Sequence, residues 1–188
     1  MSQASRAPDR EHTFRALYEA VYPDLLRFVQ RRARPACAED VVADVFLVVW
    51  RRLDELPRSR DDARAWIFGI ARNLLLNSQR AEQRRCALGV RLADAATVPS
   101  TDADTDGVVS RVDLAKAWHR LSETHQEALA LVAFEDLSAP QAATVIGISP
   151  VAFRLRLSRA RRALRLHLDH LPQQATTPAA TAERATTP

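Results

Sequence analysis

The sequence contains little glycine, lysine or cysteine and no long apolar run. Only 4 of its 188 residues are glycine, and Lys116 is the single lysine among 27 basic residues. The longest apolar stretches, 45–50 and 128–134, are far shorter than the ~20 residues that span a bilayer. Residues 1–11 are polar and lack the apolar core of a signal peptide. These absences predict a cytoplasmic protein with no membrane insertion.

Residues typical of metal sites and enzymes are also scarce. The two cysteines, Cys37 and Cys86, lie in no CxxC motif and are interpreted as reduced thiols. The five histidines show no metal-ligand spacing with acidic residues. Neither a phosphate-cradling glycine loop nor a nucleophile elbow occurs. We therefore expect no metal, no cofactor and no enzymatic activity.

The residues that are present favour an all-α fold with two small helical domains. Hydrophobic residues make up 47% of the chain, and alanine, leucine and arginine are good helix formers. The segment 93–107 carries four aspartates and no basic residue, which predicts a flexible linker. The predicted organisation is a flexible N-terminus at 1–11, a first domain at 12–88, an acidic linker at 89–108, a second domain at 109–170 and a disordered tail at 171–188.

In the first domain, apolar periodicity predicts helices at about 13–32, 38–56 and 61–85. The second of these has one core-facing stripe: Val42, Val45, Phe46, Val49 and Leu53. Leu47, Val48 and Trp50 lie off that stripe, beside Asp44 and Arg51. A helix that is apolar nearly all round is either enclosed or docks on a partner, and a small domain can hardly enclose it. We favour a protein-docking face and keep the central core helix as the alternative.

The third predicted helix has a polar ridge opposite its apolar face. The ridge consists of Asn73, Asn77, Arg80 and Arg84, spaced by 4, 3 and 4 residues. Asparagine offers a donor and an acceptor that match a base edge, and arginine offers charge for phosphate. The pattern suits nucleic-acid recognition, and the alternative is an ordinary solvated helix face.

A helix-turn-helix is predicted at 137–164. Ser138 and Gln141 form a capping box, Gly147 permits a sharp turn, and Pro150 begins the second helix. Between Pro150 and Leu166 this helix carries six arginines and no acid. Like charges at these spacings repel, so the helix is expected to bind an anionic partner such as DNA in the major groove.

The order of four segments resembles the extracytoplasmic-function (ECF, group IV) sigma factors of bacterial RNA polymerase. The segments are FRALYEAVYPDLLRFVQRR, AEDVVADVFLVVWRRLDEL and ARAWIFGIARNLLLNSQR in the first domain and LSAPQAATVIGISPVAFRLRLSRARRAL in the second. Together they extend over about 14–168, nearly the whole chain.

The resemblance implies a role for each group of residues. Core polymerase would be bound at the β′ clamp by Asp44, Leu47, Val48 and Arg51, with the β flap as a second contact. The minus-ten promoter element would be captured and melted by Arg58, Ser59, Arg60, Asn73, Asn77, Arg80 and Arg84. The minus-thirty-five element would be read as duplex by Arg154, Leu155, Arg156, Ser158, Arg159 and Arg162. An anti-sigma factor is a further possible partner.

The main alternative is a helix-turn-helix repressor or activator that acts without joining RNA polymerase. In that case the first domain would serve dimerisation, and the ridge at Asn73 would have no role. For the linker, the resemblance implies passage through the basic interior of polymerase, and a solvated spacer is the alternative.

Overall fold

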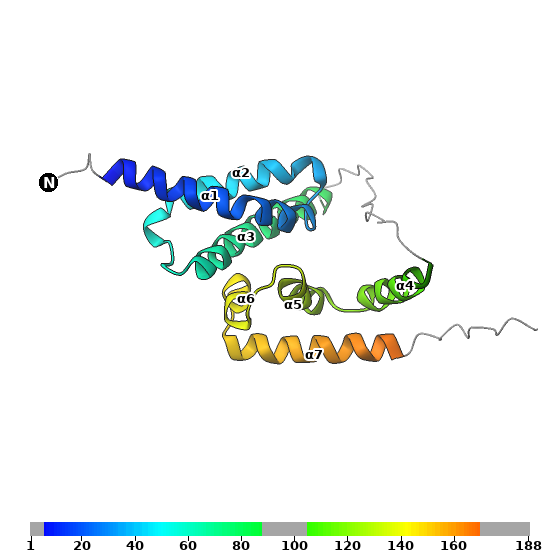
Figure 1. Cartoon of the computed structure of the whole chain (residues 1–188). Helices are drawn as coiled ribbons and strands as arrows, with labels where there is room; N and C mark the ends of the chain where they lie inside the picture. Colours follow the sequence, from blue (N-terminus) through cyan, green and yellow to red (C-terminus); the bar gives the residue numbers. More distant parts are fainter. Residues whose placement is uncertain (1–5, 88–104, 170–188) are drawn as a thin grey trace, which may run out of the picture.

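The computed structural model describes residues 6–87 and 105–169, which form seven α-helices, two short 3-10 helices and no strand. The first module contains α1 (Arg6–Gln30), η2 (Pro35–Cys37), α2 (Ala38–Arg51), η3 (Leu53–Glu55) and α3 (Arg60–Ala87). The second contains α4 (Thr105–His119), α5 (Glu123–Ala133), α6 (Ala139–Ile146) and α7 (Pro150–Asp169). The predicted all-α fold with two helical domains is confirmed (Figure 1). Most of the predicted acidic linker and the whole predicted tail lie outside the described residues.

Helix ends differ from the predicted ones in three places. Helix α1 begins at Arg6, inside the segment predicted to be flexible, because Pro8 and Asp9 are favourable in a first helical turn. Helix α4 begins at Thr105, so the end of the predicted linker is helical. Helix α2 ends at Arg51 rather than continuing to residue 56, and the chain passes through a 3-10 turn before Pro57.

The core of the first module lies between its three long helices. The buried side chains are Val21, Leu25, Phe28 and Val29 of α1, Val42, Val45, Phe46 and Val49 of α2, and Ile67, Phe68, Ala71 and Leu75 of α3. Phe28 and Phe68 stack with their ring centroids 4.8 Å apart. The predicted core stripe of α2 is thus buried, because each position faces α1 or α3.

The second module is built around α7. Phe153 and Ala160 are fully buried and Leu157 nearly so, and they pack against α5 and α6. Gly147 joins α6 to α7 with a φ of 79°. Residues that carry a side chain rarely adopt this left-handed backbone conformation, which explains the glycine at the turn.

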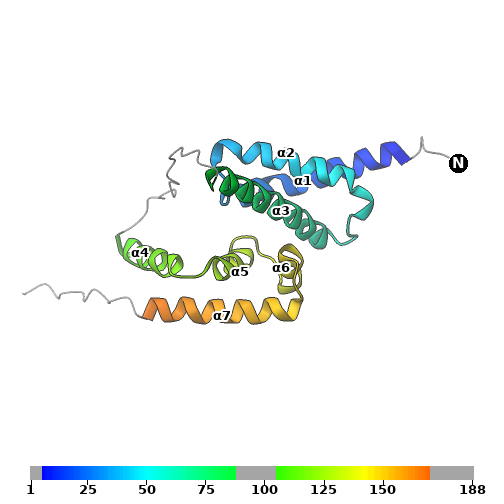
Figure 2. The same cartoon turned by 180° about the vertical axis from the view of Figure 1, so that it is seen from behind.

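The two modules pack against one another. Helices α3 and α6 make the most extensive helix–helix contact among the described residues, and both views show them adjacent (Figures 1 and 2). Buried residues of both modules form one continuous apolar cluster. The sequence predicts two domains on a flexible connection, and it contains no signal for this close packing.

Candidate polymerase and nucleic-acid interfaces

The helix-turn-helix has the predicted local geometry. The Gln141 side-chain oxygen accepts hydrogen bonds from the Ser138 N–H and hydroxyl, at 2.9 and 2.7 Å. The N–H of Gly147 donates to the Ala143 carbonyl at 2.8 Å, which closes α6. The hydroxyl of Ser149 accepts from the Ala152 N–H at 3.2 Å at the start of α7. These local bonds fix the angle at which α7 is presented.

Helix α7 exposes a basic surface. The side chains of Arg154, Arg159, Arg161, Arg162 and Arg165 are exposed, and Arg156 is half-buried. No ion pair joins these arginines to an acid within the part of the chain that the structure describes. Among the described residues no acid therefore compensates their mutual repulsion, and a polyanion would relieve it.

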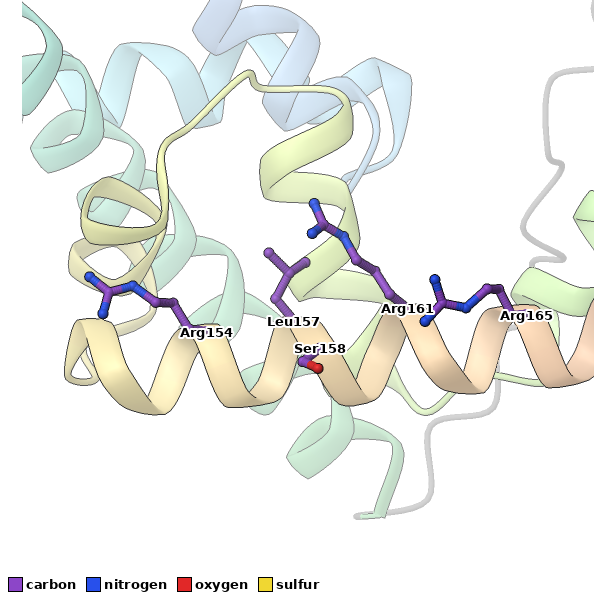
Figure 3. Close-up of a pocket in the computed structure, with 5 residues that line it drawn as sticks. All are labelled: Arg154, Leu157, Ser158, Arg161 and Arg165. Carbon is purple, nitrogen blue, oxygen red and sulfur yellow. The ribbon is translucent and has the colours of Figure 1, made fainter.

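Three of these arginines line one side of the helix. A shallow groove of about 340 Å³ is lined by Arg154, Leu157, Ser158, Arg161 and Arg165. Figure 3 shows Arg154, Arg161 and Arg165 spaced along that side of α7. Arg161 and Arg165 were not among the predicted site residues. Their spacing of 7 and 11 residues from Arg154 places them on the same helix face, and that signal was available in the sequence.

Exposed apolar side chains lie among these arginines. Leu155 is 55% exposed on α7, and Val151, one turn earlier, is 62% exposed. Apolar groups at this position can contact a thymine methyl in the major groove. The predicted residues Arg154, Leu155, Ser158 and Arg159 are all accessible.

The predicted minus-ten residues lie in two places along α3. Arg58, Ser59 and Arg60 are exposed around the start of the helix, and Asn73, Asn77 and Arg80 are exposed further along it. The side chain of Arg84 lies outside the described residues. From Arg60 to Asn73 the helix rises about 20 Å at 1.5 Å per residue. The structure therefore separates the loop from the ridge and does not gather them at one point.

The outer face of α2 is accessible. Leu47 is 55% exposed, Asp44 and Arg51 are exposed, and Val48 is half-buried. Leu47 is therefore not enclosed in the core, which argues against the central-helix alternative at this position.

Trp50 of α2, although it lies off the core stripe, packs against side chains of α1. Its ring meets Phe14 edge-on with centroids 5.1 Å apart, and the Arg10 guanidinium lies 5.4 Å from its centroid. Arg10 also forms an ion pair with Asp54 at 2.8 Å. Trp50 thus stabilises the α1–α2 packing, although its sequence position resembles that of Leu47.

Two ionic contacts shift pKa values, one within the first module and one between the modules. Burial raises the pKa of Asp24, but hydrogen bonds and charge from Arg27 and Arg64 outweigh it, so that the pKa is lowered overall. Burial lowers the pKa of Arg32, and the Glu135 carboxylate acts in the opposite direction. Arg32 nevertheless remains charged at neutral pH, as arginine does in proteins.

Among residues 6–87 and 105–169, no three His, Cys, Asp or Glu side chains are grouped so that they could hold a metal ion. None of the helices described is both long and apolar enough to cross a membrane.

Comparison with protein families identifies both modules. The model of Sigma-70 region 2 matches residues 17–85, and the model of Sigma-70, region 4 matches residues 111–164. Both regions are parts of the sigma-70 class of transcription initiation factors. Individual relatives narrow the class.

The ECF RNA polymerase sigma factor SigL of Mycobacterium tuberculosis is 32% identical over 158 residues, or 84% of this chain and 89% of that protein. RNA polymerase sigma factor CnrH of Cupriavidus metallidurans is 32% identical over 140 residues, or 70% of this chain and 73% of that protein. The structure of sigma factor RpoE in complex with the anti-sigma factor NepR from Bartonella quintana matches with a TM-score of 0.62 and 28% identity, covering 84% of this chain and 98% of that one.

The chain belongs to the ECF sigma factors of RNA polymerase. The resemblance inferred from the four segments is confirmed. Its function is accordingly to direct RNA polymerase to promoters, and the repressor alternative is not favoured.

Proposed function

We propose that three exposed surfaces carry out separate steps of transcription initiation: the outer face of α2, the polar side of α3 with the loop before it, and the basic face of α7. The outer face of α2 docks on the β′ clamp of core RNA polymerase through Asp44, Leu47, Val48 and Arg51. Helix α7 enters the major groove of the minus-thirty-five element. The observation that carries the proposal is that an exposed apolar face and an exposed basic face lie on different modules of one chain. A repressor needs only the basic face.

Promoter melting is assigned to α3 and the loop before it. A base that leaves the duplex loses a few kcal/mol of stacking and pairing, which must be recovered in a pocket or on a polar ridge. Asn73 and Asn77 offer paired donors and acceptors for a base edge, and Arg80 offers charge for the backbone. Arg58, Ser59, Arg60 and Arg84 complete the proposed minus-ten surface.

The minus-thirty-five residues divide between bases and phosphates. Arg154, Leu155 and Ser158 lie within the first three turns of α7 and are proposed to face base edges. Arg156, Arg159 and Arg162 are proposed to contact the phosphate backbone. Base contacts specify sequence, whereas phosphate contacts supply affinity that falls with salt.

The remaining partners and the setting follow from this role. The protein acts by binding and positioning, polymerase performs the chemistry, and no cofactor is needed. The site of action is the bacterial cytoplasm, and the β flap is proposed as a second polymerase contact. Because the related RpoE was solved with the anti-sigma factor NepR, we extend the same kind of partner to this chain.

The test is run-off transcription. Purified protein is mixed with core polymerase and a library of promoter fragments, and transcripts are sequenced. We expect transcripts that start downstream of shared minus-ten and minus-thirty-five motifs. The proposal fails if no transcript forms and the protein instead binds operator DNA tightly without polymerase.

A further inference from the structure

The start of α1 contacts the end of α2 through one arginine. Arg10 lies in the segment 1–11 that the sequence predicts to be flexible, yet its guanidinium binds residues 40 and 44 positions away. Its Nη1 donates to both oxygens of the Asp54 carboxylate at 2.9 and 2.8 Å, and its Nη2 donates to the Trp50 carbonyl at 3.0 Å. The guanidinium carbon lies 5.4 Å from the centroid of the Trp50 ring. In both views the start of α1 lies beside the chain that joins α2 to α3 (Figures 1 and 2).

The contact with the Trp50 carbonyl caps the end of a helix. The last four carbonyls of an α-helix have no partner within the helix, and this end carries partial negative charge. The N–H of Arg52 binds the carbonyls of Val48 and Val49, which leaves the carbonyl of Trp50 to another donor. A guanidinium placed there donates a hydrogen bond and offsets the negative charge. Arg10 therefore acts as a cap for α2 that is supplied by α1.

The 3-10 turn η3, which follows α2, is held from two sides. On one side Asp54 of this turn binds Arg10 of α1. On the other side the guanidinium of Arg52 lies 5.5 Å from the ring of Trp66 of α3. Between them, Leu53 is buried in the core. The position of η3 therefore depends on α1 through Arg10 and on α3 through Arg52.

The connection from η3 to the proposed minus-ten loop is short and stiff. Leu56 has a φ of −59° and a ψ of 125°, the extended conformation that a following proline favours. The ring of Pro57 fixes its own φ. Arg58 and Ser59 come next and are exposed. Because few rotatable angles separate them from η3, the direction in which Arg58 and Ser59 are presented follows the position of η3.

We propose that Arg10 is a positioning residue for promoter recognition. By binding the end of α2 and η3, it holds the loop 58–60 in the conformation that receives a base of the minus-ten element. This role in promoter recognition rests on the proposed function of the loop. The order that Arg10 imposes on the loop does not, because it is a property of the free chain.

The first measurement follows the loop in the full-length free chain by hydrogen–deuterium exchange and mass spectrometry. In Arg10→Gln, the backbone amides of 53–60 should exchange about fivefold faster, the scale of an exposed ion pair. Arg15→Gln, which replaces an exposed arginine of the same helix, is the matched control and should leave the exchange unchanged. Equal exchange in the parent and in Arg10→Gln would overturn the proposal.

Two further variants separate these contacts from general damage to α1. Arg10→Lys keeps the charge but loses the planar fork that binds a carboxylate and a carbonyl together, so it should restore only part of the slow exchange. Asp54→Asn should also speed exchange, and combining it with Arg10→Gln should give less than the sum of the two effects, because both changes break one contact. Complete recovery by lysine, or fully additive effects, would contradict the proposed positioning.

The second measurement tests the consequence for promoter recognition. In run-off transcription from single-base variants of both promoter elements, Arg10→Gln should weaken the base preference at minus-ten positions about three- to fivefold and leave the minus-thirty-five preferences unchanged. A merely structural role would lower transcription from every template alike, and that result would overturn the proposal, as would an unchanged minus-ten preference. If the parent itself shows no minus-ten preference, the proposed function fails, whereas the exchange measurement still decides whether Arg10 holds the loop.

Discussion

The apolar face of α2 gives the most direct prediction, because exposure of Leu47 sets the size of the effect. Burying a whole leucine side chain contributes about 1.5–3 kcal/mol. In the free chain 55% of Leu47 is exposed. Docking that covers this exposed part therefore contributes about half of that free energy to binding. Leu47→Ala is expected to weaken binding to core polymerase about five- to tenfold, since tenfold corresponds to about 1.4 kcal/mol.

A charged replacement should have a larger effect on binding and little on folding. Leu47→Glu places an unpaired carboxylate in the interface, which costs several kcal/mol and should abolish detectable binding. Val48→Glu is expected to abolish binding as well, but Val48 is half-buried against the core, so this variant should also lower the free energy of unfolding. Because Leu47 is more than half exposed, its replacement should change the free energy of unfolding by less than about 1 kcal/mol. Val45→Ala, at a fully buried position of the same helix, should cost about 2 kcal/mol.

The assay compares two leucines of equal exposure. Leu155 on α7 is also 55% exposed, so Leu155→Ala removes the same amount of accessible apolar surface elsewhere. Competition binding to core polymerase without DNA should show a loss for Leu47→Ala and none for Leu155→Ala. Equal losses for both variants would refute the assignment of α2 as the docking face. Loss of helix content in Leu47→Glu would instead support an enclosed core helix.

Three further predictions concern DNA reading and stability. Arg154→Ala should cost about 1–3 kcal/mol at one base position of the minus-thirty-five element, measured by binding to a library of single-base variants, and a uniform loss would assign Arg154 to phosphate. Gly147→Ala should lower the free energy of unfolding by about 1–2 kcal/mol in urea titration, because the position has a φ of 79° and no neighbour within 4 Å; an unchanged midpoint would show that the turn relaxes. The lowered pKa of Asp24 predicts that its ion pairs with Arg27 and Arg64 stabilise the fold at neutral pH, and that this stabilisation is lost as pH falls from about 4 through the folded-state pKa. The stability difference between the parent and Asp24→Asn, up to about 1 kcal/mol, should therefore disappear in acid, and a constant difference would contradict this.

Local structure was predictable wherever the signal lies within a few residues. The capping box at Ser138, the turn at Gly147 and the buried stripe of α7 depend on spacings of three or four residues, which a sequence displays directly. The amphipathic pattern of α2 likewise predicted which side chains are buried. Helix ends were less predictable, because Thr105 and Arg6 begin helices through weak preferences of the first turn.

Two positions show where periodicity is insufficient. Leu47 and Trp50 both lie off the core stripe of α2, yet Leu47 is open while Trp50 packs on Phe14 and Arg10. The difference arises because α1 packs against Trp50 and leaves Leu47 uncovered. The role of each residue on the polymerase and promoter surfaces remains a prediction that the variants above address.

The sequence by itself determined the helices, the two modules, the basic helix and the family, because these depend on neighbours along the chain and on the order of four segments. The tertiary structure alone decided that the two modules pack on one another. The Glu135 carboxylate lies beside Arg31 and Arg32, and the α6 backbone approaches α3 closely at Gly69. Glu135 is separated from Arg31 by 104 positions in the chain, and no pattern in the sequence specifies which distant charges meet. Arg31 and Glu135 form an ion pair because helix packing brings the end of α1 next to the end of α5, and only the folded backbone sets that arrangement.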